Sequence, residues 1–260
     1  QMYIINSINI SNSKLNIILN IPTLTHTPNL SDTIFVSIAS YRDEECPKTL
    51  LNLYKNAKNP TKIFVGICQQ NDTGDTDCLD GIINNNSDVL PVNNIRIVRI
   101  PYYDAMGCGY ARYMSSKLWN RETFYLQIDS HTQFIKGWDE ICISSVKDAE
   151  SIIPKEKNTN GKVAVSYFPK ANYSETEELP VNTDGSLPYT CSSSVKENGL
   201  IGIGAQEIAD FKDFPIVIPS IAGGFMFVRS NFLKTIPYDP LILYSVEEEV
   251  LLAARLWTHG

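Results

Sequence analysis

The chain has 260 residues, 43% of them hydrophobic and 20% charged, which is ordinary for a globular protein and enough to bury a core. Its formal net charge is -7 and its basic residues do not cluster, which disfavours nucleic-acid binding because that binding relies on neutralising phosphates. The most apolar early run, Ile17–Ile21, is far too short to span a bilayer, and it lacks the basic flank and cleavage site of a signal peptide.

The first half of the chain alternates apolar runs with helical patterns. Residues 1–31 are rich in Asn, Ser and Thr, and we expect them to form an arm or linker. After residue 47, where a proline suits a first helical turn, we expect a helix through Tyr54, and a second helix from Tyr110 to Trp119. Buried strands are predicted at residues 33–40, 62–68, 95–100 and 124–129.

Strands that alternate with helices indicate an α/β domain with a largely parallel sheet. Polar residues follow three of these strands, at positions 40–43, 69–70 and 129–131. In such sheets ligands bind in the crevice beyond the carboxyl ends of the strands. The pattern therefore predicts a nucleotide-binding half built on this edge of the sheet.

The pattern is looser after residue 135. Apolar runs predict further strands at 163–168 and 221–228, with a polar stretch at 170–200 that we expect to be a long loop. The segment 245–258 is expected to be a helix with one apolar face.

Six cysteines occur, and none belongs to a C-x-x-C pair. Several have apolar or strand-like neighbours, so we expect reduced, mostly buried thiols rather than a disulfide framework or a zinc site. The even number leaves disulfide bridges open. The cysteines are at positions 46, 68, 78, 108, 142 and 191.

The strand at 124–129 ends abruptly on Asp129-Ser130-His131. In an extended chain, Asp129 and His131 would point the same way and Ser130 the other way. A carboxylate beside an imidazole at a strand end can hold a divalent cation. The alternative is a solvated strand end at which Asp and Ser begin a turn.

Seven short segments occur in the order found in one known family. The chain resembles the cytoplasmic hydroxyproline-directed polypeptide N-acetylglucosaminyltransferases and, more distantly, the mucin-type polypeptide N-acetylgalactosaminyltransferases. The resemblance extends from Thr33 to Gly260. Its segments are Ser37–Asp43, Gly109–Arg112, Gln127–His131, Gly137–Asp139, Ala222–Gly224, Tyr238–Pro240 and Glu248–Trp257.

This resemblance implies a GT-A glycosyltransferase fold, with a Rossmann-like, mostly parallel central sheet and helices on both faces. Residues 32–260 would form the catalytic domain, with a truncation at the C-terminus left open. The implied activity is retaining transfer of a sugar, best N-acetylglucosamine, from a UDP-sugar to a hydroxyl of a protein or glycan acceptor. The resemblance also implies a cytoplasmic location and a divalent metal, usually Mn²⁺, held by an Asp-x-His signature that Asp129 and His131 match.

The resemblance also suggests contacts with the nucleotide. Arg112, near a helix start, would contact the diphosphate or the uridine, since a helix N-terminus and a guanidinium both favour anions. The alternative is an ordinary surface arginine. Tyr41, Arg42 and Asp43 would lie beside the nucleotide, with Asp43 the best candidate for holding the uracil or ribose. Here the alternative is simple turn chemistry.

Further residues would shape the sugar pocket. Gly223 and Gly224 would let the backbone approach the donor sugar closely, or they mark only a strand entry. Glu248 would act as a catalytic residue facing the sugar and the acceptor. Alternatively it completes a capping box with Ser245.

The metal site has an open question. The relatives supply a third metal ligand, a histidine, beyond the segment that ends here at Gly260. A catalytically silent module that binds nucleotide or glycan is therefore a second hypothesis. A zinc hydrolase fits less well, because zinc requires three protein ligands plus water.

Overall fold

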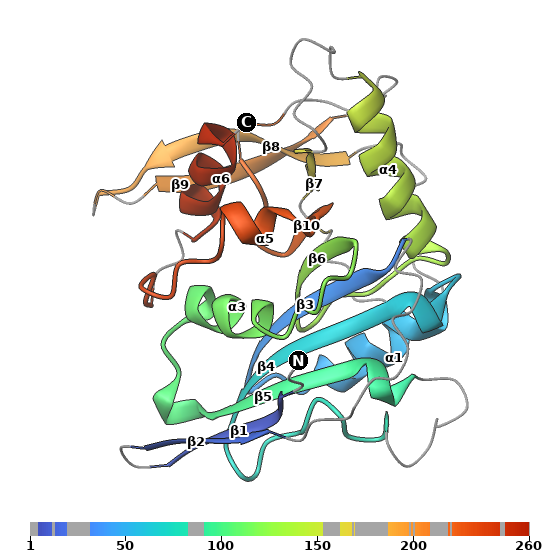
Figure 1. The fold of residues 1–260 in the computed structure, drawn as a ribbon. Helices are drawn as coiled ribbons and strands as arrows, with labels where there is room; N and C mark the ends of the chain where they lie inside the picture. The colour runs from blue at the N-terminus through green and yellow to red at the C-terminus, as the bar shows by residue number, and fades with distance from the viewer. Residues whose placement is uncertain are drawn as a thin grey trace.

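The computed structural model of the chain describes residues 5–11, 14–19, 32–82, 91–152, 162–167, 169, 187–197, 199, 201–208, 218, 220–244 and 248–259. Its centre is a six-stranded sheet with the strand order β5-β4-β3-β6-β10-β7 (Figure 1). In that order the strands span Ile95–Pro101, Ile63–Asn71, Ile34–Tyr41, Phe124–Asp129, Phe225–Arg229 and Ala164–Ser166.

The first four strands of this order run parallel to one another. Ile38 of β3 is aligned with Ile67 of β4 on one side and with Ile128 of β6 on the other. β10 runs antiparallel to β6, and β7 antiparallel to β10. The predicted α/β class with a mostly parallel sheet is confirmed. β10 begins later than predicted because Gly223 and Gly224 form a turn before it.

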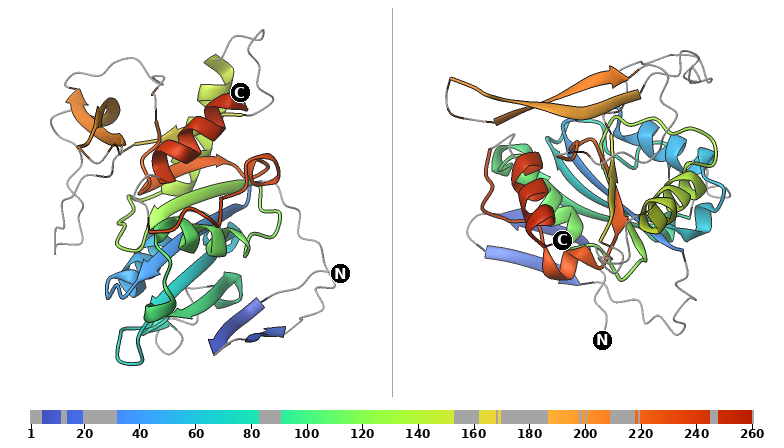
Figure 2. Two further views of the ribbon diagram at one scale, coloured as in Figure 1. Left: turned by 90° about the vertical axis from the view of Figure 1, so that its left-hand side faces the viewer. Right: turned by 90° about the horizontal axis from the view of Figure 1, so that it is seen from above.

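Helices cover both faces of the sheet. Figure 2 shows α1 and α4 on one side of it, with α3 and α6 on the other. The described helices are too short or too polar to cross a bilayer. The α-helices span Cys46–Asn56 (α1), Cys108–Ser116 (α3), Trp138–Ile152 (α4), Phe232–Thr235 (α5) and Glu248–Thr258 (α6), and the 3-10 helices Pro60–Lys62 (η1), Val92–Asn94 (η2) and Tyr102–Asp104 (η3).

The alternation of side chains along β3 explains these two layers. Ile34 and Val36 point into a core shared with α1 and α4, where Leu53 and Trp138 are buried. Phe35 points to the opposite face, into a core shared with α3, α5 and α6. Every residue of β3 from Ile34 to Ile38 is nearly inaccessible to solvent. A strand buried on both faces reads as a continuous apolar run.

Two antiparallel hairpins lie outside the central sheet. The N-terminal region, predicted as an arm or linker, contains β1 (Ile5–Ser11) paired with β2 (Lys14–Leu19), and β1 lies beside β5 (Figure 1). The second hairpin pairs β8 (Leu187–Val195) with β9 (Ile201–Ile208). The prediction of a continuous loop over 170–200 is wrong where β8 lies. Its Ser- and Thr-rich sequence has no clear alternation, so only its pairing with β9 reveals the strand.

A disulfide joins Cys46, at the start of α1, to Cys78, in the loop after β4. The prediction of reduced thiols is wrong for this pair. The two residues are separated by 32 positions in sequence, yet their Cα atoms lie 4.9 Å apart because β3 and β4 are neighbours. Cys68, Cys108 and Cys142 are free thiols among the described residues.

Candidate active site

The predicted site residues gather at the carboxyl ends of β3, β4 and β6. Tyr41 ends β3 and is aligned with Gln70 of β4, while Asp129 ends β6 and is aligned with Ala39 of β3. We call this edge, with the turns that follow the three strands, the carboxyl edge. This is the edge beyond which the sequence predicts that ligands bind.

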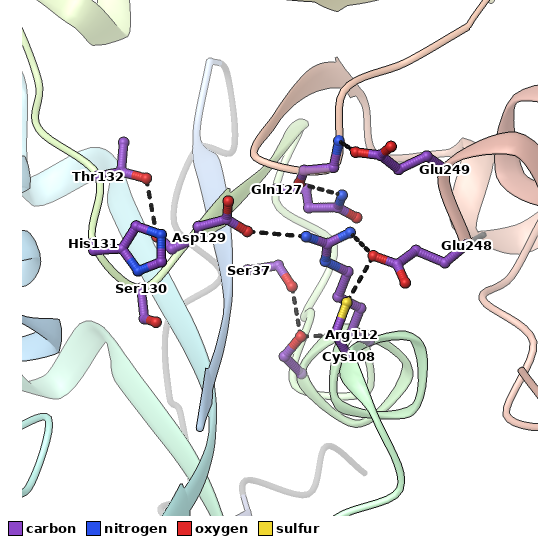
Figure 3. A network of polar contacts seen from close by, with 12 residues as sticks. Ser37, Cys108, Arg112, Gln127, Asp129, Ser130, His131, Thr132, Glu248 and Glu249 are labelled. Atoms are coloured by element: carbon purple, nitrogen blue, oxygen red, sulfur yellow. Dashed lines mark hydrogen bonds and ion pairs between the residues drawn. The ribbon is translucent and has the colours of Figure 1, made fainter. Parts of the chain in front are cut away.

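Arg112 lies at the centre of the site (Figure 3). Its side chain projects from α3 and is only 5% exposed. One terminal nitrogen donates to Asp129 Oδ1 at 3.0 Å, and the other donates to Glu248 Oε1 at 2.5 Å. A buried cation is tolerated only with such partners. Arg112 is therefore not the surface arginine that the sequence had left as an alternative.

The charges around Arg112 keep it protonated. Burial by itself lowers the pKa of Arg112, but the nearby carboxylates of Glu248 and Asp129 oppose burial and the pKa is raised. The Sγ atom of Cys108 lies 2.7 Å from Glu248 Oε1 as a hydrogen-bond donor. Desolvation is the largest cause that raises the pKa of the Cys108 thiol, to about 12. The neighbouring Glu248 adds to this effect, and Arg112 opposes it. The thiol therefore stays protonated.

Glu248 is the first residue of α6, and its side chain is buried. The capping box with Ser245 lies outside the described residues, so the two hypotheses for Glu248 are not separated by its position. Two buried polar atoms, Glu248 Oε2 and Arg112 Nε, have no hydrogen-bond partner among the described residues. Buried polar atoms are normally paired.

Gly223 and Gly224 lie directly over this cluster. A Cβ atom at Gly223 would lie 2.7 Å from both Arg112 Nη1 and Glu249 Oε1, and one at Gly224 would lie 2.7 Å from Asp129 Oδ2. Only glycine allows the backbone to approach these side chains so closely. The two glycines therefore do more than begin β10.

Glu249 also belongs to this cluster, although nothing in the sequence distinguished it from Glu248. Its Oε1 accepts a hydrogen bond from the backbone N–H of Gly223 (Figure 3). Burial, as the largest cause, raises the pKa of Glu249, and the nearby Glu248 and Asp129 add to it. Two adjacent glutamates carry no signal that says which one reaches the backbone, so only the fold distinguishes them.

Gln127 also stabilises the turn at Gly223. Its Nε2 donates to the carbonyl oxygen of Gly223 at 2.8 Å, and its Oε1 accepts from the Tyr238 hydroxyl. Both partners belong to segments that the resemblance had singled out. Gln127 and Glu249 together fix the backbone of Gly223 from two sides.

His131 pairs with Asp43 rather than with Asp129. Its Nδ1 lies 2.8 Å from Asp43 Oδ2, which also accepts a hydrogen bond from Ser130 Oγ at 2.5 Å. Burial raises the pKa of the Asp43 carboxyl, but these bonds and the Glu45 backbone N–H outweigh it and lower the pKa below its ordinary value.

The expected alternation of Asp129, Ser130 and His131 is wrong. β6 ends at Asp129 and the chain turns at once, so the geometry of an extended strand does not reach His131. Ser130 and His131 both bond to Asp43, whereas Asp129 bonds to Arg112. Figure 3 shows the Asp129 carboxylate directed at the guanidinium of Arg112.

The side chains of Asp129 and His131 suit a divalent cation by their chemistry. They are 43% and 48% exposed at the carboxyl edge, and a carboxylate with an imidazole is compatible with Mn²⁺. Within the described ranges, no cluster of three or more His, Cys, Asp or Glu is placed to bind a metal ion. The two residue types therefore suit a divalent cation, although here Asp129 bonds to Arg112 and His131 bonds to Asp43.

Tyr41 and Arg42 flank the site. Tyr41 is exposed, and Arg42 adopts a left-handed backbone conformation with φ of 50°. The Arg42 guanidinium forms two hydrogen bonds with Asp75, at 2.8 and 3.0 Å, and lies over the ring of Tyr102. Their contact with a nucleotide remains a prediction.

Comparison with known proteins gives one family and a shared fold. The model of the family "Glycosyltransferase (GlcNAc)" matches residues 33–83 and 81–260. No curated protein sequence matches the chain. A crystal structure of S. aureus TarS 1–349 is 19% identical, with 87% of this chain and 56% of that chain covered and a TM-score of 0.47.

A second solved structure is GalNAc-T7 with UDP, GalNAc and Mn²⁺, which is 15% identical, with 86% of this chain and 40% of that chain covered. Its TM-score of 0.52 shows a shared fold, the GT-A fold. The chain spans about half the length of the two solved proteins or less.

Proposed function

The chain belongs to the glycosyltransferase (GlcNAc) family, and we propose that it is a metal-dependent, retaining transferase. It would move N-acetylglucosamine from UDP-N-acetylglucosamine to a hydroxyl of a protein or glycan. The observation that carries this proposal is the ion-paired cluster in which buried Arg112 joins buried Glu248 to half-exposed Asp129, with two glycines packed closely against it. Such a cluster offers charged donors and acceptors in a place where a sugar could approach the backbone.

Asp129 and His131 would hold the divalent cation, with Mn²⁺ the first choice. When bound, the cation supplies Lewis-acid neutralisation of the diphosphate leaving group. A chain with a net charge of -7 has particular need of such neutralisation to bind an anionic donor. The GalNAc-T7 structure, solved with UDP, GalNAc and Mn²⁺, supports this class of donor and cation.

The chain's own residues would bind and orient the donor. Arg112 would place its positive charge near the diphosphate, and the carboxylates of Asp129 and Glu248 would accept hydrogen bonds from sugar hydroxyls. Gly223 and Gly224 would let the sugar lie against the backbone that Gln127 and Glu249 hold in place. Most of the rate enhancement would come from positioning and from stabilising the leaving group, rather than from a protein nucleophile.

A catalytically silent module that binds nucleotide or glycan is the second candidate. It is favoured by one observation: among the described residues, no cluster of three or more His, Cys, Asp or Glu is placed to bind a metal ion. Such a module would still bind its ligand but would not catalyse sugar transfer.

The two candidates are separated by assaying UDP release from several UDP-sugars with Mn²⁺, beside calorimetry with UDP and with glycans. The enzyme predicts Mn²⁺-dependent UDP release that increases when a hydroxyl acceptor is added. The silent module predicts binding of UDP or of a glycan, without UDP release from any donor. If the chain binds neither UDP nor glycan and releases no UDP, both candidates are wrong.

A further inference from the structure

Asp43 lies in the turn after β3, where both of its carboxylate oxygens are engaged by the protein itself. Oδ2 is 2.8 Å from His131 Nδ1 and accepts from Ser130 Oγ at 2.5 Å. Oδ1 accepts from the backbone N–H of Glu45 at 2.9 Å. The Asp43 side chain is 17% exposed, whereas that of His131 is 48% exposed. The Asp43 carboxylate is therefore less exposed to solvent than the imidazole to which it is bonded.

We infer that Asp43 is a positioning residue for His131. A carboxylate at Nδ1 favours the tautomer that carries its proton there, so the ring presents Nε2 as the nitrogen that binds a cation. Asp43 also limits the rotation of the ring. This inference rests on the proposed function, because it takes His131 as a ligand of the donor-bound cation. It assigns Asp43 a task other than contact with uracil or ribose.

The surroundings hold this pair in place. The Thr49 hydroxyl of α1 donates to the carbonyl oxygen of Ser130 at 2.8 Å, and the Thr132 hydroxyl donates to that of Asp129 at 3.0 Å. The turn after β6 is thereby tied to α1. Asp43 itself is tied to the start of α1 by the Glu45 backbone. Both members of the pair are therefore fixed to the same helix, which is what a preorganised ligand requires.

The test compares Asp43→Asn with wild type in two measurements on the full chain. The amide is nearly isosteric but replaces a charged acceptor with a neutral acceptor and a donor. The first measurement is the tautomer of His131 in metal-free protein, from long-range ¹H–¹⁵N spectra recorded at about pH 8.5, where an ordinary imidazole is neutral. Only three histidines are present, so His131→Gln assigns the signal.

The second measurement is the affinity for Mn²⁺ with UDP present, by calorimetry. We expect wild type to show the tautomer protonated at Nδ1. In Asp43→Asn the population of that tautomer should fall, and Mn²⁺ binding should weaken by about 10- to 100-fold, as for loss of an outer partner of a metal ligand. Glu44→Gln is the matched control: it removes one negative charge from an exposed residue of the same turn, next to Asp43.

Each outcome decides the inference. An unchanged tautomer together with Mn²⁺ affinity within about two-fold of wild type overturns it while leaving the proposed function intact. Equal weakening in Glu44→Gln overturns it as well, because the effect would then be one of net charge. If wild type binds no Mn²⁺ in the presence of UDP, the proposed metal site fails and the inference with it. A tautomer shift with weaker Mn²⁺ binding in Asp43→Asn alone supports it.

Discussion

Arg112 on α3 and Glu248 on α6 form a buried ion pair 2.5 Å long, although 136 residues separate them in sequence. Their side chains are only 5% and 9% exposed. This pair connects the last described helix to the carboxyl edge of the sheet. It also places a second carboxylate beside the guanidinium that bonds Asp129.

Glu248→Gln tests whether the charge of this carboxylate matters. The amide oxygen can still accept from Arg112, so we expect the free energy of unfolding to fall by about 1–2 kcal/mol, less than on removal of a whole buried partner. Turnover should fall by about 10²-fold or more if the proposed function is right, because it places this negative charge beside the donor sugar. Leu251→Gln, at an exposed position of α6, is the control for both measurements. Full activity of Glu248→Gln would leave Glu248 with a structural role alone.

Gly224→Ala tests the close approach of the backbone to the site. The new Cβ would lie 2.7 Å from Asp129 Oδ2, so either the carboxylate or the turn must move. A shift of about 1 Å in a site can cost about 10²-fold in rate, and we expect kcat/KM for the donor to fall on that scale. Gly74→Ala is the matched control, because nothing lies within 4 Å of its Cβ position. Equal kinetics for the two variants would contradict a role for Gly224 in the pocket.

The Glu150–Arg229 pair predicts a pH dependence of stability away from the site. Two hydrogen bonds, at 2.5 and 2.7 Å, join α4 to β10, and the bond from Arg229 lowers the pKa of Glu150 below its ordinary 4.5. A lowered folded-state pKa stabilises the protein above the unfolded value, and that stabilisation is lost as pH falls through the folded value.

Wild type should therefore exceed Glu150→Gln in free energy of unfolding by about 1 kcal/mol near neutral pH, since the pair is partly solvated. The difference should shrink as the pH falls below about 4.5, as measured by urea unfolding at several pH values. Glu44→Gln, at an exposed position, should show no such trend. A difference that grew on acidification would contradict the sign.

The Cys46–Cys78 disulfide is open to a direct test. Peptide mapping without reduction should recover the two cysteines in one linked species. Closing a loop of 32 residues corresponds to about 3–4 kcal/mol of stability. Dithiothreitol should destabilise wild type by that amount and leave the double variant Cys46→Ser/Cys78→Ser unchanged.

Such bridges persist in oxidising compartments, so a linked species would stand against the cytoplasmic location expected from the resemblance. Recovery of both cysteines as free thiols would instead restore the reduced state that the sequence predicted.

The sequence predicted the strands well because strands buried on both faces are continuous apolar runs. Because the strands were predicted to be parallel, Asp129 and the turn after β3 were expected at the same edge of the sheet. Contacts between distant segments were not predictable in this way. Glu249 reaches Gly223 only because α6 lies beside β10, and a sequence of adjacent glutamates does not reveal which one turns inward. The β8–β9 hairpin is a local contact, and it was missed because the sequence of β8 shows no clear alternation.

The most direct test of the proposed function is UDP release from UDP-N-acetylglucosamine, measured with and without Mn²⁺ for wild type, His131→Ala and the control His259→Ala. His259 is an exposed histidine directly after α6, and it has no role in the proposed site. We expect Mn²⁺-dependent release by wild type and by the control, and loss of that release by orders of magnitude in His131→Ala. Near-normal, Mn²⁺-dependent turnover by His131→Ala would contradict the metal site on which the proposed function rests.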